Sequence, residues 1–250
     1  MKISSVNYLN SVPFVRGLQH SGLFSDFVLR LDPPALCAKV WIEGTVAVGL
    51  VPVAVLPLVP DYEIVADYCI GCDGAVHSVA LFSEVPLEEI ETVVLDYQSR
   101  TSVNLVRVLA RHHWKTHHWQ WKPADPGYEQ HISGTTAAVV IGDRAFDMYH
   151  SFPHVFDLGE GWKEFTGLPF VFAVWAANRP VAPAKRKAFN AALSWGLDHR
   201  EEAIATFEGT LEQQAFYAEY LRQYIHYELG APQLEAIKRF HAYLKEGTTI

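Results

Sequence analysis

The chain has 250 residues, of which 50% are hydrophobic and 19% are charged, and its formal net charge is −8. This length and apolar content allow a substantial core, in one large domain or two small lobes, and exclude a largely disordered chain. The net negative charge argues against nucleic-acid binding. No apolar run reaches the roughly 18 residues that a membrane-spanning helix needs. Since the amino terminus has no signal-peptide pattern, the sequence predicts a cytoplasmic protein that binds neither nucleic acid nor membrane.

Strands and helices are expected to alternate over the first part of the chain. Asn10 or Ser11 can cap the first helix, and Pro13 suits its first turn. The alternation predicts an α/β fold with a mainly parallel sheet. The expected elements are a strand at 2–6, a helix from about 13 to 20, a helix at 35–42, a strand at 46–51, a helical turn from Pro52, and strands at 75–83 and 93–95.

The second part of the chain begins with an amphipathic helix at 103–110 and then returns to strands. From Pro183 onward the pattern is helical, with about three helices broken near Gly209 and Gly230. The elements expected between these helical regions are strands at 119–122, 137–141, 155–158 and 170–176, and helices at 144–149 and 161–165.

Two breaks in the pattern, near 84–89 and 173–177, divide the chain into lobes. Residues 1–83 and 178–250 are expected to form one lobe, and residues 90–172 the other. The chain would then pass between the lobes twice, which would leave a cleft between them. Ligands commonly bind in such clefts, and two lobes joined in this way can close around a ligand by a hinge motion.

Polar or glycine-rich loops follow several of the expected strands. The Ser99–Ser102 loop opens a helix, so its free amides and hydroxyls suit an anion, although plain helix capping is the alternative interpretation. Asp96 and Asp143 also stand at strand ends, where they are a weak sign of acid–base chemistry or simple helix caps. The other loops are Tyr8–Ser11, Gly74–Ser78 and Gly142–Asp143.

The cysteine and histidine patterns are compatible with redox or metal chemistry, but an ordinary structural role is favoured for both. An odd count of three cysteines argues against a disulfide framework, and the Cys69-x-x-Cys72 motif follows a strand-like stretch rather than opening a helix. The histidine-rich run at 112–118 has no carboxylate or cysteine at ligand spacing and suits a solvated helix terminus. We therefore expect no metal site.

Several stretches, in order, resemble the chorismate dehydratase family of the futalosine route to menaquinone. Tyr8-Leu9-Asn10 fits this family better than the related enzyme that cleaves dehypoxanthine futalosine, whose opening has a Pro-Cys-Pro-Asn-Asp character. The stretches that carry the resemblance are Ile3–Pro13, Val48–Val53, Ser99–Ser102, Ile141–Asp143 and Trp162–Phe170.

The resemblance implies a two-lobed, periplasmic-binding-protein-like (type II) fold. It also implies a hydro-lyase that removes water from chorismate, without a cofactor, to give 3-[(1-carboxyvinyl)oxy]benzoate. A monomer or a homodimer is compatible with the sequence. The alternatives are a non-enzymatic solute-binding or sensing protein for small anions on the same fold, and the related futalosine-pathway enzyme.

We expect two catalytic residues, Asn10 at the reacting end of the substrate and Ser78. Thr101 and Ser102 are expected to hold a substrate carboxylate. No strong base stands among the motif residues, so the enolpyruvyl carboxylate of chorismate is the favoured proton acceptor, ahead of Asp143. The expected substrate-binding residues are Tyr8, Ser11, Ser99, Arg100, Thr101, Ser102, Gly142 and Asp143.

Overall fold

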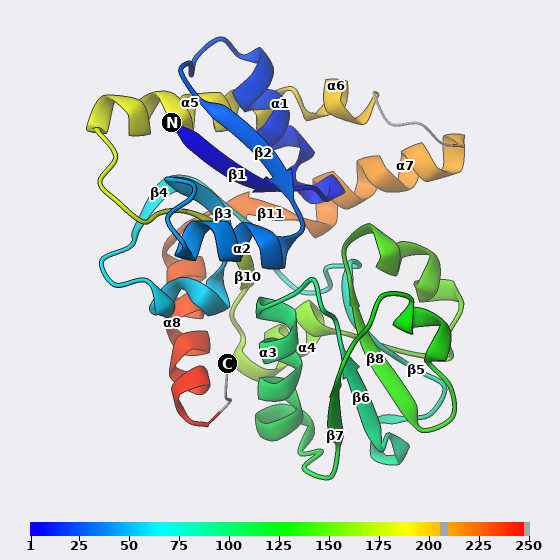
Figure 1. Cartoon of the computed structure of the whole chain (residues 1–250). Coiled ribbons are helices and arrows are strands. Elements are labelled where there is room, and N and C mark those ends of the chain that lie inside the picture. Colours follow the sequence, from blue (N-terminus) through cyan, green and yellow to red (C-terminus); the bar gives the residue numbers. More distant parts are fainter. Residues whose placement is uncertain (206–209, 248–250) are drawn as a thin grey trace. The chain divides into compact units, whose positions relative to one another are not determined.

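The computed structural model describes residues 1–205 and 210–247 (Figure 1). The chain divides into two compact units. The first unit combines Met1–Gly71 with Val171–Gly230, and the second combines Cys72–Phe170 with the chain from Ala231 onward. Each unit is built around one sheet.

The first unit contains a mixed sheet in the order β11-β4-β10-β3-β1-β2. β1 pairs in parallel with both β2 and β3, whereas β10 is antiparallel to β3. Every residue of β3 and β10 is buried, so these central strands appear in the sequence as continuous apolar runs. The strands are β1 (Lys2–Val6), β2 (Val28–Asp32), β3 (Val48–Pro52), β4 (Glu63–Cys72), β10 (Phe170–Ala177) and β11 (His226–Glu228).

Helices of the first unit follow the strands. The α-helices are α1 (Val12–His20), α2 (Pro34–Ile42), α5 (Pro183–Asp198), α6 (Arg200–Ile204) and α7 (Leu211–Glu219). Short 3₁₀ segments, η1 (Leu9–Ser11) and η2 (Val53–Leu58), follow β1 and β3, and a π-helical turn, η7 (Tyr220–Tyr224), follows α7.

A glycine contact fixes α1 against α5. A Cβ atom on Gly17 would lie 2.1 Å from the carbonyl oxygen of Ala192, and one on Gly196 would lie 2.0 Å from that of Pro13. Only glycine permits this backbone approach. The contact therefore sets the position of α1, which begins directly after the η1 segment.

Gly17→Ala is expected to lower the free energy of unfolding by about 3 kcal/mol, because the new methyl group meets backbone that cannot move aside. Gly161→Ala is the control, since its Cβ would meet only side-chain atoms of Leu109 and Trp114, at 3.3 Å or more. Urea unfolding of the two variants measures the difference. Equal stability of both would contradict the close approach of α1 and α5.

The second unit contains a mixed sheet in the order β7-β6-β8-β5-β9. β6 is parallel to β7 and β8, while β5 is antiparallel to β8 and β9. The strands are β5 (Val79–Ser83), β6 (Thr92–Leu95), β7 (Gln120–Pro123), β8 (Thr136–Ile141) and β9 (His154–Asp157).

Three α-helices accompany this sheet: α3 (Thr101–Leu109), α4 (Leu158–Thr166) and α8 (Ala231–Lys245). α3 and α4 pack beside one another and against the sheet (Figure 1). The remaining helical segments are η3 (Leu87–Glu89), the π-helical turn η4 (Ala110–Trp114), η5 (Tyr128–His131) and η6 (Gly142–His150).

The sequence-based boundaries of the two lobes differ from these units at two places. Residues 72–83 belong to the second unit because β5 pairs with β8 and β9. α8 also belongs there, since the Phe240 ring lies 5.2 Å from that of Phe170 and 6.0 Å from that of Trp162. Helical periodicity alone does not show which unit an amphipathic helix covers.

Most expected elements are present, and the α/β fold class with mixed sheets is confirmed. β2 and β11 were not expected from the sequence, and of β4 only a strand-like stretch before the Cys69-x-x-Cys72 motif was expected. The helix expected at 144–149 is a 3₁₀ segment, and the break expected near Gly209 lies outside the described residues. Across residues 1–205 and 210–247, no helix combines the length and apolarity needed to cross a membrane.

Candidate functional site

Four loops meet at one edge of the sheet in the second unit. Because β5 runs opposite to β8 and β9, its amino end shares an edge with the carboxyl ends of β6, β8 and β9. The register places Val79 opposite Ile141, so Ser78 and Gly142 follow side by side. This edge therefore brings together Ser78, Gly142, Asp157 and the segment from Asp96 to Ser102, and binding sites in α/β folds favour such strand ends.

Ser78 and Gly142 are joined through their backbones. The amide of Gly142 donates to the carbonyl of Ser78 over 2.8 Å, and Ser78 is only 1% exposed. Gly142 has φ +69°, a conformation that favours glycine and turns the chain from β8 into η6. Ser78 is thus held in a fixed position, which suits a residue that acts on a ligand.

The carboxylate of Asp157 organises the loop that carries Ser78. Its Oδ1 caps α4 by accepting from the amides of Gly159 (2.9 Å) and Glu160 (3.1 Å). Its Oδ2 accepts from the amides of Val76 (3.0 Å) and His77 (2.8 Å). One oxygen therefore holds the helix and the other holds the loop.

Tyr149 completes this arrangement. Its hydroxyl donates to Asp157 Oδ2 over 2.7 Å, and its ring stacks on His77 with centroids 5.2 Å apart. His77 has φ +57°, which is strained for a residue with a side chain. The sequence analysis did not single out Asp157, although its place at the end of an apolar strand was a usable signal.

The start of α3 carries four of the expected ligand-binding residues. The Ser99 hydroxyl accepts from the amide of Ser102 over 2.9 Å, which is the capping role considered from the sequence. Ser99, Thr101 and Ser102 are each less than 5% exposed, whereas Arg100 is exposed. The Ser102 hydroxyl itself makes no hydrogen bond within the described residues.

Asn104, one turn into α3, adds a polar group that the sequence analysis did not consider. Its side-chain nitrogen donates to the carbonyl of Arg100 over 2.8 Å. Its Oδ1 is buried and has no partner in the described part of the chain. A buried carbonyl oxygen without a donor is costly, so this oxygen is suited to a ligand hydroxyl or a bound water.

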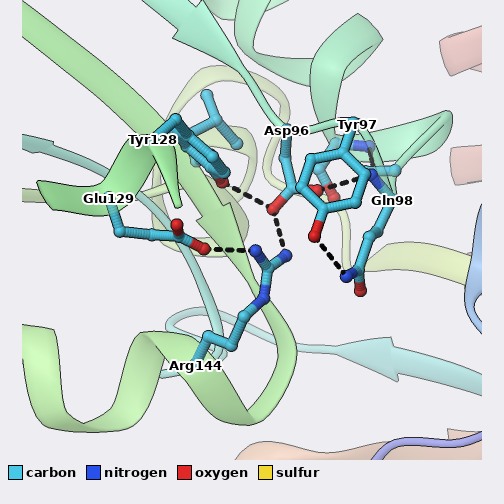
Figure 2. A network of polar contacts seen from close by, with 9 residues as sticks. Asp96, Tyr97, Gln98, Tyr128, Glu129 and Arg144 are labelled. Carbon is cyan, nitrogen blue, oxygen red and sulfur yellow. Dashed lines mark hydrogen bonds and ion pairs between the residues drawn. The ribbon is translucent and has the colours of Figure 1, made fainter. Parts of the chain in front are cut away.

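Asp96, at the end of β6, is the centre of a buried network (Figure 2). Its Oδ2 accepts from Tyr128 (2.7 Å) and Arg144 (2.5 Å), and its Oδ1 accepts from the amide of Gln98 (2.7 Å). Arg144 also pairs with Glu129. Burial raises the pKa of Asp96, while Arg144 and the hydrogen bonds act against that rise.

This network makes Asp96 a structural anchor. Its carboxylate oxygens are engaged by Tyr128, Arg144 and Gln98, and the Arg144 guanidinium lies over the Tyr97 ring at 5.6 Å. The carboxylate expected at this strand end is therefore present, but its role is structural, because it joins β6 to η5 and η6. Asp143 is exposed on η6.

Arg144→Gln is expected to lower stability more at pH 8 than at pH 5. Without the guanidinium, the folded-state pKa of Asp96 rises further, so the protonated carboxyl limits the loss at low pH. Above the usual pKa range of a carboxyl group, Asp96 of the variant is ionised more readily in the unfolded chain than in the folded one. The stability deficit of the variant relative to the wild type therefore grows by about 2 kcal/mol. Urea unfolding at both pH values, with Lys122→Gln as control, measures this difference; a deficit independent of pH would contradict it.

In the first unit, the loop after β1 carries Asn10. The Tyr227 hydroxyl donates to the carbonyl of Asn10 over 2.9 Å, and the Asn10 side-chain nitrogen lies 3.4 Å from the Tyr220 hydroxyl. The Asn10 Oδ1 is buried and has no hydrogen-bond partner among the described residues. Burial raises the pKa of Tyr227 well above its usual value, so its hydroxyl remains a neutral donor.

Aromatic packing fixes the backbone around Asn10. The Phe14 ring, in the first turn of α1, lies edge-on to Tyr227 at 5.3 Å and to Trp175 at 5.9 Å. Such edge-to-face pairs favour a single geometry. Asn10 is therefore a rigidly held amide with an unused acceptor, and its tyrosine partners come from a part of the chain that motif analysis left out.

The other residues of this loop differ in their accessibility. The Ser11 hydroxyl lies within donating distance of the carbonyls of Val6 (2.6 Å) and Tyr8 (2.9 Å), so it closes the turn after β1. Tyr8 is partly exposed. Of the two residues expected to bind substrate here, Tyr8 is the more accessible.

The loops at 8–11, 99–102 and 141–143 coincide with the motifs that resembled a known family, and comparison with known proteins tests that resemblance. The menaquinone biosynthesis family matches residues 1–246. The chain belongs to this family. A chorismate dehydratase of Thermus thermophilus is 29% identical over an alignment of 202 positions, and the match covers 71% of this chain and 70% of that protein.

Solved structures establish the fold of this menaquinone biosynthesis family member. An Archaeoglobus fulgidus protein has a TM-score of 0.74 at 13% identity, covering 98% of this chain and 96% of its own. The periplasmic aliphatic sulphonate binding protein of Escherichia coli has a TM-score of 0.62 at 15% identity, covering 98% and 91%. A Candida albicans protein described as having the generic periplasmic binding protein fold has a TM-score of 0.65 at 9% identity, covering 97% and 90%. The periplasmic-binding-protein-like fold expected from the resemblance is confirmed.

The cysteines of this family member are buried, and none of Cys37, Cys69 and Cys72 forms a disulfide. Burial raises the pKa of the Cys37 thiol to about 12 and also raises that of Cys69. Cys69 lies in β4 with its sulfur 3.5 Å from the carbonyl of Glu228, and Cys72 packs where a Cβ on Gly159 would otherwise fit. These thiols fill space in the core, which agrees with the ordinary structural role favoured from the sequence.

The histidine run ends α3, as expected, but it is not simply solvated. The ring of His112 packs 4.8 Å from that of Tyr243 in α8, and burial together with Arg111 lowers its pKa. His113 lies 3.4 Å from the Glu164 carboxylate. In the described part of the chain, no three His, Cys, Asp or Glu side chains come together as a metal site.

Proposed function

We propose that the chain is a chorismate dehydratase, a cofactor-independent hydro-lyase that acts in the cytoplasm and forms 3-[(1-carboxyvinyl)oxy]benzoate. The observation that carries this proposal is the relationship to the Thermus thermophilus chorismate dehydratase within a family of menaquinone biosynthesis. The rigid polar loops of the two units support it, because each offers donors or acceptors suited to a hydroxylated dicarboxylate.

The reaction needs a proton removed from C3 of chorismate and hydroxide lost from C4. The ring carboxylate, conjugated through the C1–C2 double bond, acidifies the C3 hydrogen. The electrons of the C3–H bond form a new ring double bond as the C4–O bond breaks, and the proton leaves with the hydroxide as water. Since the product is aromatic, the protein mainly has to position groups and stabilise developing charge.

Asn10 has the properties needed at the reacting end. Its buried Oδ1 has no donor among the described residues, and the C4 hydroxyl of chorismate is a donor that would satisfy it. Its backbone is fixed by Tyr227, so the amide need not reorganise during the reaction. We assign Asn10 to orienting the leaving hydroxyl and bridging the proton transfer, with the substrate enolpyruvyl carboxylate as the base.

Ser78 and the start of α3 are assigned to the carboxylates and the proton path. Ser78 is held by Gly142 and, through its loop, by Asp157. Thr101 and Ser102, at the start of a helix, suit an anionic group because of the helix dipole and the Ser102 hydroxyl. Tyr8, Arg100 and Asp143, which are less buried, are assigned to outer contacts with the substrate.

The double variant Thr101→Val and Ser102→Ala is expected to raise KM for chorismate by about 10- to 100-fold with a smaller change in kcat, since it removes uniform binding. Ser99→Ala is the matched control because its hydroxyl caps the helix, so it should mainly lower stability, by about 1 kcal/mol. Steady-state kinetics and thermal unfolding separate the two effects. An unchanged KM in the double variant would show that these residues only begin the helix.

The second candidate function is a non-enzymatic protein that binds small anions. The fold shared with a sulphonate-binding protein favours it. The two functions separate in one experiment in which chorismate is added at increasing concentration. Consumption of chorismate supports the dehydratase, whereas thermal stabilisation without consumption supports binding alone.

A further inference from the structure

One segment of the second unit is basic, although the chain as a whole is acidic. Residues 97–124 contain no aspartate or glutamate, although the whole chain has a net charge of −8. The basic residues of this segment are Arg100, Arg107, Arg111, Lys115 and Lys122. A local concentration of positive charge in an acidic protein attracts anions to that place.

A pocket of about 390 Å³ lies in this segment, at the end of α3 and the start of β7. None of the described residues that line it is acidic. The polar and aromatic side chains of its lining are Arg107, Arg111, Thr116, His117 and Trp121, and Ala110 and Gly247 complete it.

The two arginines are held in place by the protein. The guanidinium of Arg107 lies over the Trp121 ring at 5.7 Å, and burial lowers the pKa of Arg107. Arg111 Nη1 donates to the carbonyl of Glu246 over 3.0 Å. Stacked and tethered guanidinium groups lose little freedom when they bind an anion, and their planar donors suit phosphate oxygens.

Thr116 gives independent evidence of a ligand. It is 7% exposed, yet its hydroxyl has no hydrogen-bond partner in the described residues. Its amide donates to the carbonyl of Ala110 over 2.9 Å, which fixes the turn that places the side chain in the pocket wall. A buried hydroxyl without a partner costs stability, and an anion in the pocket would accept a hydrogen bond from it.

We propose that this pocket binds a small phosphate-bearing anion, either free phosphate or a phosphate monoester. Two guanidinium groups, an imidazole and a hydroxyl line one concavity, and no carboxylate is among the described residues that line it. The pocket is distinct from the loops assigned to chorismate in this unit, because α3 separates Thr101 from Arg111. The nine residues of α3 span about 14 Å.

Isothermal titration with inorganic phosphate and with glycerol 3-phosphate, at matched ionic strength, tests the proposal. Arg111→Gln is expected to weaken phosphate binding at least about 10-fold, and Thr116→Val about 3- to 10-fold. Lys122→Gln removes one nearby charge that does not line the pocket and should change binding by less than about two-fold. Tighter binding of the ester identifies a monoester as the ligand, and equal binding identifies free phosphate.

No measurable binding of either anion by the wild-type chain would overturn the proposal, as would equal weakening by Lys122→Gln and Arg111→Gln. Thr116→Val provides a second readout that does not depend on the titration. Without phosphate, this variant should unfold at a higher temperature than the wild type because a buried unpaired hydroxyl is gone. With saturating phosphate, this advantage should shrink, because the wild type binds the anion about 3- to 10-fold more tightly and is stabilised more by it. A variant that is less stable than the wild type without phosphate, or whose advantage does not shrink with phosphate, would contradict the role of Thr116.

Discussion

Asn10→Ala is expected to lower kcat for chorismate by about 100- to 1000-fold, the loss typical of a preorganised group that acts in the transition state. Stability should change by less than about 1 kcal/mol, because the variant removes a buried oxygen that has no partner along with one long contact to Tyr220. Steady-state kinetics and urea unfolding on the same preparations measure both quantities.

The matched control is Asn7→Ala, which removes an exposed amide three residues earlier in the same loop. It should retain wild-type kcat and KM. Asn10→Asp adds a further comparison, since it keeps an acceptor at this position and introduces a charge that repels a dianionic substrate. It should raise KM as well as lower kcat. Wild-type turnover in Asn10→Ala would remove Asn10 from the mechanism.

Asp157→Ala is expected to destabilise the chain by about 4 kcal/mol and to abolish measurable turnover. It leaves α4 uncapped and frees the amides of Val76 and His77, together with the Tyr149 hydroxyl, inside the second unit. Loss of a helix cap costs about 1 kcal/mol, and each buried donor left unpaired costs about 1–3 kcal/mol.

Asp157→Asn separates the two roles of this carboxylate. Its Oδ1 can still cap α4, whereas an amide group in place of Oδ2 presents a donor to the amides of Val76 and His77. This variant should stay folded, with a loss of about 2 kcal/mol, yet lose most of its turnover because the Ser78 loop is released. Thermal unfolding and kinetics on both variants test this. Full activity in Asp157→Asn would show that the loop does not depend on the carboxylate.

The parts of the fold that could be predicted from the sequence are those whose pattern is local. The buried strands β3, β8 and β10 appear as apolar runs, and α1 is marked by Pro13 at its start. β2 and β11 were missed because they are short and carry polar residues. α8 was assigned to the other lobe because its place depends on contacts of Phe240 and Tyr243 with residues 70 or more positions away in sequence, such as Phe170 and Phe165.

The candidate site shows the same division. Asn10, Ser78 and the start of α3 were predicted as candidates from motif loops at strand ends, since strand ends are where ligands bind in α/β folds. The residues that position them, Asp157 and Tyr227, act through contacts that span 80 residues or more. Such contacts leave no spacing signal in a single sequence, and their roles became apparent only from the geometry.

The measurement that tests the proposed function most directly is mass spectrometry of chorismate incubated with the purified chain. We predict a product lighter than chorismate by one water, aromatic by its absorption, and still carrying the enolpyruvyl group. The Asn10→Ala protein at the same concentration should form this product far more slowly. Chorismate recovered unchanged after incubation with the folded wild-type chain would contradict the dehydratase assignment.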